Sequence, residues 1–167
     1  MAKDQERLIV CETTSKWAVA LRRTIPPEVR PPISETRGLE DCWQQAVASP
    51  VSVVVLEVTT ANLEQLAAAL PKYRATLPGT RAVVVGSRRL AAAEWLMREL
   101  GAVHVIFSSR DLKPLIGILR RHRKHVAAAR PPKDTPPWRD LPWPRADDRW
   151  ETETPKAEPR WLSGEVS

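Results

Sequence analysis

Two carboxylates stand where apolar runs of the sequence end. Glu57 closes the run within SVVVLEVTT (residues 52–60), and Glu12 directly follows LIVC. Together they could bind a divalent cation weakly, but two carboxylates supply too few of the oxygen ligands that such an ion takes. We therefore predict no metal site and no cofactor, and nearby positions offer no obvious partner for Glu57. Cys11, within the apolar run, is expected to be a small buried residue and not a reactive thiol.

Five strand and helix units would position these residues. Each short apolar run is followed by a segment whose apolar residues recur every three or four positions. The predicted strands are 8–12, 32–36, 51–58, 81–87 and 102–107, and the predicted helices are 14–25, 38–49, 63–70, 88–100 and 111–125. Pro71 is expected to end or kink the third helix, whereas Pro114 fits the first turn of the fifth.

The strands are apolar on both faces, which predicts parallel strands with helices on both sides. We therefore predict an α/β fold, a doubly wound five-stranded parallel sheet of flavodoxin-like topology with strand order 2-1-3-4-5. In such a fold the binding site lies outside the carboxyl ends of the strands, which is where Cys11, Glu12 and Glu57 fall.

Composition divides the chain near residue 128. We predict an α/β domain over 7–127 and a disordered tail over 128–167, because the tail holds eight of the sixteen prolines and four of the seven tryptophans without any apolar period. Residues 1–127 hold 19 Lys and Arg against 12 Asp and Glu, so the positive charge belongs to the predicted domain.

Cysteine content and hydropathy indicate the cellular compartment that we expect for the protein. The two cysteines lack metal-ligand spacing and suit buried thiols in a reducing compartment. No apolar run reaches about 18 residues, and the N-terminal MAKDQERLIV lacks the long apolar stretch of a secretion signal. We expect a cytoplasmic protein that makes no membrane contact.

With its elements in this order, the sequence resembles the receiver domains of bacterial response regulators over about residues 7–126. In that family the first strand ends in an acidic pair that helps to hold Mg²⁺, the third in the phospho-accepting Asp, the fourth in a Thr or Ser, and the fifth in a Lys. The resemblance places the acidic pair at Cys11 and Glu12 in LIVCET and the acceptor at Glu57 in VVVLEV. It places the hydroxyl at Ser87 in VVVGS and the lysine position at Ser108 in GAVHVIFSS.

The departures from the family pattern imply that the phosphorylation chemistry is lost. Glu57 is one methylene longer than aspartate, Cys11 removes a metal-side carboxylate, and Ser108 removes the balancing cation. A carboxylate displaced by about 1 Å without a positive partner should not support receiver phosphorylation. The resemblance therefore implies a pseudo-receiver, in which Glu57 is either a solvated acid or a built-in negative charge that imitates the phosphorylated state.

We predict a non-catalytic protein-interaction or regulatory module in bacterial signal transduction. By family analogy, its partner surface is the face of the fourth helix, fifth strand and fifth helix, with Arg98, Arg120 and Arg121. One alternative is an atypical receiver that is still phosphorylated, and another is a small flavodoxin-like enzyme or nucleotide binder. The loop CETTSK argues against the latter, because it lacks the glycine-rich turn that close phosphate approach requires.

Two further segments bear on partners. In the tail, Trp138 and Trp143 lie in PPWRDLPWP, and tryptophans among prolines are typical of short docking peptides. We expect them to dock either on this domain or on another protein. The basic run LRRHRKH (119–125) ends a predicted helix, where cations oppose the helix macrodipole and are usually solvated. Because no aromatic platform or DNA-binding motif accompanies the run, we do not expect a nucleic-acid partner. A second copy of the chain is an alternative protein partner.

Overall fold

The computed structural model describes residues 6–129 of the chain. The predicted tail, apart from its first two residues, lies outside these described residues. The five strands are β1 (Leu8–Cys11), β2 (Ile33–Thr36), β3 (Val53–Val58), β4 (Arg81–Gly86) and β5 (His104–Ile106). The helices are α1 (Lys16–Thr24), α2 (Leu39–Ala48), α3 (Leu63–Thr76), α4 (Glu94–Glu99) and α5 (Lys113–Ala129), with a 3-10 helix, η1 (Arg88–Ala93), before α4.

The strands form one parallel sheet in the order β2-β1-β3-β4-β5. This confirms the predicted topology. The register sets Cys11, the last residue of β1, beside Leu56, two residues before the end of β3, so the two central strands end at the same edge of the sheet. All four residues of β1 are buried, as expected for a strand covered on both faces.

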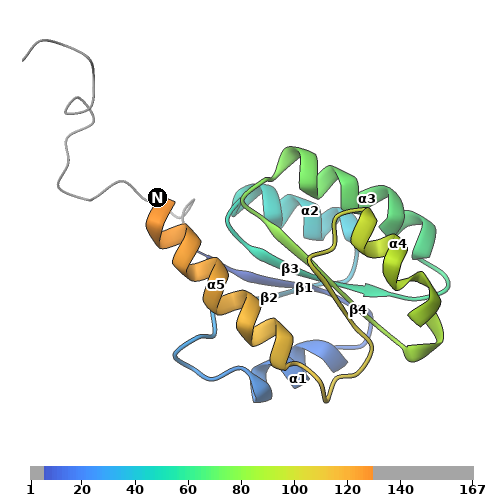
Figure 1. Cartoon of the computed structure of the whole chain (residues 1–167), viewed down its shortest axis with the longest axis horizontal. Helices are drawn as coiled ribbons and strands as arrows, with labels where there is room; N and C mark the ends of the chain where they lie inside the picture. The colour runs from blue at the N-terminus through green and yellow to red at the C-terminus, as the bar shows by residue number, and fades with distance from the viewer. Residues whose placement is uncertain (1–5, 130–167) are drawn as a thin grey trace, which may run out of the picture. The chain divides into compact units, whose positions relative to one another are not determined.

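Helices cover both faces of the sheet. Figure 1 shows α1 and α5 on one face and α2, α3 and α4 on the other. On the first face, side chains of α1 and α5 such as Trp17 and Leu119 pack against alternate strand residues. On the second, Cys42, Leu70 and Met97 pack against the remaining ones. The alternation explains why short runs of valine can serve two cores at once.

Two details of the helices differ from the sequence prediction. Helix α3 does not end at Pro71 but continues to Thr76, because Leu70 and Tyr73 are buried on either side of the proline and their packing outweighs the lost backbone hydrogen bond. The single helix predicted over 88–100 is instead η1 followed by α4, and η1 buries none of its residues. Pro114 is the second residue of α5, as predicted.

Among residues 6–129, no helix is long and apolar enough to cross a membrane.

Candidate functional site

The carboxyl edge of the sheet gathers the residues singled out from the sequence. Cys11 ends β1, Glu57 lies near the end of β3, Ser87 directly follows β4, and Ser108 lies just beyond β5. Because the strands are parallel, these positions share one edge, and the surrounding contacts decide what each side chain can do.

Glu12 is fully buried beneath the start of α1, with 1% of its surface exposed. Its Oε2 accepts a hydrogen bond from the Trp17 backbone N–H at 2.7 Å, and its Oε1 accepts one from Ala18 at 2.7 Å. These amides belong to the first helical turn, which has no intrahelical acceptors and favours a negative charge. Glu12 therefore caps α1, and both of its oxygens are engaged by the protein itself.

A left-handed residue makes this cap possible. Ser15 immediately precedes α1 with a φ of 57° and makes no side-chain capping bond to the helix. Its hydroxyl instead donates to Glu35 at 3.0 Å and accepts from Arg37 at 2.7 Å. The Glu12 carboxylate therefore accepts the hydrogen bonds of the first helical amides, whereas the side chain of the residue that precedes a helix usually accepts them.

Glu57 does have a partner, Thr13. Its Oε2 accepts from the Thr13 backbone N–H at 2.9 Å and from the Thr13 hydroxyl at 3.1 Å. The half-buried glutamate therefore fastens the segment between β1 and α1 to the end of β3. Its extra methylene, which an aspartate lacks, gives the carboxylate this reach.

Cys11 lies against Cys42 of α2, and both thiols are buried. The hydrogen bond with Cys42 lowers the pKa of Cys11 to about 7, although burial opposes this shift. The same hydrogen bond and burial raise the pKa of Cys42. The buried hydroxyls of Thr36 and Tyr73 lie at this thiol pair. The predicted burial of Cys11 is confirmed, and its side chain is directed into the core between the sheet and α2.

A cleft of about 450 Å³ opens at the same edge. Glu57, Ser87 and Ser108 all line it, whereas Cys11 and Glu12 do not. The structure thus brings together three of the five positions to which the resemblance pointed and separates the other two. In the described part of the chain, no group of three or more His, Cys, Asp or Glu side chains is arranged to hold a metal ion.

The lining of the cleft includes four cations that sequence reasoning did not connect with it: Lys16, Arg88, Arg89 and Arg110. They come from the start of α1, from η1 and from the loop that follows β5. No periodic pattern joins residues so far apart in the sequence. Only their position next to the strand ends could have indicated that they converge.

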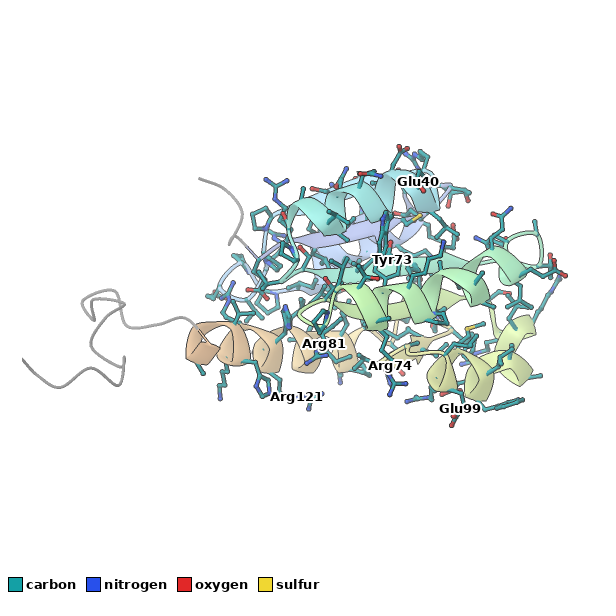
Figure 2. All side chains as sticks on the ribbon, turned by 90° about the horizontal axis from the view of Figure 1, so that it is seen from above. Glu40, Tyr73, Arg74, Arg81, Glu99 and Arg121 are labelled. Carbon is teal, nitrogen blue, oxygen red and sulfur yellow. The ribbon has the colours of Figure 1, made fainter. Side chains whose placement is uncertain are left out.

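The three arginines of the predicted partner surface, Arg98, Arg120 and Arg121, do not line this cleft. Arg98 of α4 donates from Nε and Nη2 to Glu94 at 2.9 and 2.8 Å, and its Nη2 is 3.2 Å from His104 Nδ1 on β5. Burial and the neighbouring Arg98 lower the pKa of His104. Arg120 and Arg121 are exposed on α5, and Figure 2 shows Arg121 projecting from the outer side of this helix.

The two tryptophans predicted to dock, Trp138 and Trp143, lie outside the described residues. Their role stays a prediction.

Comparison with known proteins supports the fold. No protein-family model and no curated protein sequence matches the chain. A response regulator from Thermotoga maritima aligns with a TM-score of 0.58 at 12% identity, covering 72% of this chain and 98% of its own. A CheY-like protein (tadZ) from Pseudomonas aeruginosa aligns with a TM-score of 0.55 at 14% identity, over 78% of this chain and 98% of its own.

A third solved structure, a pilus assembly-related protein from Burkholderia pseudomallei, aligns with a TM-score of 0.53 at 15% identity, over 73% of this chain and 93% of its own. At these identities the likeness concerns the fold. The chain has the fold of response-regulator receiver domains. Because a shared fold does not imply a shared function, the function of the cleft depends on its own residues.

Proposed function

We propose that this protein is a pseudo-receiver, a non-catalytic module that acts in bacterial signal transduction by binding another protein. One observation carries the proposal: the two carboxylates nearest the receiver's reaction site are both engaged by hydrogen bonds within the chain. Glu12 caps α1, and Glu57 holds Thr13. A carboxylate that accepts buried amides at 2.7 Å is poorly placed to take part in a metal site as well.

The side chains around Glu57 support the same conclusion. Aspartyl phosphorylation needs an in-line carboxylate, a metal ion, and a cation that balances the charge of the acyl phosphate. Here Cys11 is turned into the core, and Ser108 offers only a hydroxyl whose oxygen accepts from the Arg110 backbone N–H at 3.3 Å. The metal-side carboxylate and the lysine of the family pattern are thus both absent from their positions, and this supports a receiver fold that is retained for binding.

The face formed by α4, β5 and α5 is the proposed partner surface. Arg120 and Arg121 are exposed there, and Arg98 is held in place by two hydrogen bonds, from Nε and Nη2, to Glu94 Oε1. Such a basic face suits an acidic surface on the partner and would act mainly on the rate and specificity of association. The tail with Trp138 and Trp143 is the second proposed contact.

Charge reversal tests this surface. The partner is captured from the native cell extract with the full chain, with an Arg120→Glu, Arg121→Glu double variant, and with a chain lacking residues 130–167. Lys72→Glu is the matched control, because Lys72 is also exposed but lies on α3, across the sheet. We expect the double variant to lose most of the captured partner and Lys72→Glu to retain it. Undiminished capture by both the double variant and the shortened chain would contradict the proposed surfaces.

A further inference from the structure

The cleft beside Glu57 carries an unusual concentration of positive charge. Lys16, Arg88, Arg89 and Arg110, here called the basic cleft residues, line it together with a single carboxylate, that of Glu57. All four cations are exposed to solvent at the rim. Like charges gathered around a concave surface repel one another and attract small anions.

Among the described residues, no acid forms an ion pair with any of the basic cleft residues. Within residues 6–129, the ion pairs join Arg22 and Arg37 to Glu35, Arg98 to Glu94, and Arg123 to Glu6. The Glu57 carboxylate, the one acid that lines the cleft, is bonded to Thr13. The positive charge of the cleft is therefore available to a ligand.

The remaining lining narrows the ligand's chemistry. The hydroxyls of Ser87, Ser108 and Ser109 add donors beside the guanidinium groups, a combination that suits the oxygens of a phosphate. Phe107 and Leu90 supply apolar wall. A volume of about 450 Å³ is in the range of small-molecule sites and has room for more than a bare phosphate ion.

We infer that the basic cleft binds a phosphate-bearing small molecule of nucleotide size, without a metal ion and without forming a covalent bond. The β1–α1 segment has no glycine to bring backbone amides close to a phosphate, so arginine side chains supply the donors instead. The inference builds on the proposed function, since a receiver fold that no longer accepts a phosphoryl group would here respond to a bound phosphate compound.

The test is to titrate the full chain with pyrophosphate, with AMP and with ATP, each in the presence of EDTA. Binding is measured by isothermal calorimetry and by the NMR shifts of the Ser87, Ser108 and Ser109 amides. We expect saturable binding that shifts these amides. Arg88→Ala and Lys16→Ala should each weaken it about tenfold or more, as for loss of a charge-assisted hydrogen bond. Lys72→Ala is the control, since Lys72 is equally exposed but lies on α3 and does not line the cleft, and it should leave the affinity unchanged.

The arms of the experiment separate the sources of the phosphate. Tighter binding of AMP than of pyrophosphate, which carries more phosphate charge, supports a ligand of nucleotide size. Equal or tighter binding of pyrophosphate shows recognition of the phosphate group alone and overturns the inferred ligand size. Arg88 also lines an adjacent hollow beside His104, whereas Lys16 does not.

Weakening by Arg88→Ala but not by Lys16→Ala would therefore place the anion elsewhere and overturn the inference. Absence of saturable binding, or equal weakening by Lys72→Ala, would overturn it too. The pseudo-receiver proposal would be untouched by such results, because it is tested separately by partner capture and by phosphoryl transfer.

Discussion

Replacing Glu12 by glutamine tests whether this carboxylate belongs to the helix or to a metal site. The substitution keeps the size of the side chain but leaves one acceptor oxygen in place of two. An amide NH₂ would then face the backbone N–H of Trp17 or Ala18, at a position where both present contacts are 2.7 Å long. One charge-assisted bond is lost and one donor is left unsatisfied in a site that is only 1% exposed.

The expected cost follows from these contacts. A hydrogen bond to a charged group contributes about 1.5 to 3 kcal/mol, and a buried unsatisfied donor costs about 1 to 3 kcal/mol. Because the two figures overlap in part, we expect Glu12→Gln to lower the free energy of unfolding by about 2 to 4 kcal/mol. In urea unfolding followed by far-UV circular dichroism, the midpoint should fall by about 1 to 2 M at an unchanged slope.

Glu57→Gln is the matched control. Its carboxylate also accepts two hydrogen bonds, but the site is open to solvent, so the loss should stay below about 1 kcal/mol. If Glu12→Gln costs no more than Glu57→Gln, the buried cap is refuted. Glu12 would then be free to face a cation.

Three further outcomes are expected. Gly86→Ala should destabilise the protein by about 1 to 3 kcal/mol in urea unfolding, because the new Cβ would lie 2.6 Å from Val58 Cγ1 and 3.0 Å from the Val58 carbonyl oxygen. Gly117→Ala, measured in the same way, should instead stabilise α5 by about 0.5 to 1 kcal/mol, because its Cβ would meet nothing within 4 Å. The thiol pair should make the free energy of unfolding rise between about pH 7 and 9, because in this range the unfolded chain still holds the Cys11 proton that the folded chain has released. Above about pH 9 the trend should reverse, because the raised pKa of Cys42 keeps its proton on the folded chain while the unfolded chain releases it. Urea unfolding across this range should show a gain on the order of 1 to 2 kcal/mol that Cys11→Ser abolishes, and a gain that persists in this variant would contradict the assignment.

Much of the fold follows from local patterns. Runs such as VSVVVLEV are apolar on both faces, and, alternating with segments of helical period, they predict parallel strands with helices on each side. Pro71 shows where local reasoning fails, because burial of Leu70 and Tyr73 holds α3 together beyond it. Similarly, the 3-10 geometry of η1 could not be read from a segment whose alanines suit a regular helix.

The site was less predictable than the fold. That Glu57 lies at the carboxyl edge follows from the sequence, but its partner Thr13 is 44 residues away and carries no signal of the pairing. The cap by Glu12 depends on the left-handed turn at Ser15, a conformation that serine seldom adopts and that no pattern announces. Convergence of the basic cleft residues likewise depends on three separate segments meeting at the sheet edge.

The central claim is that the phosphorylation site of the receiver fold is dismantled. It is tested most directly by incubating the full chain with acetyl phosphate and Mg²⁺ and measuring the mass of the intact chain and of the peptide that contains residue 57. A variant combining Cys11→Asp, Glu57→Asp and Ser108→Lys is run alongside, because positioning, metal and cation act as one unit. We expect no phosphoryl group on the wild-type chain and detectable incorporation at position 57 of the triple variant. Incorporation of a phosphoryl group at Glu57 of the wild-type chain would contradict the claim.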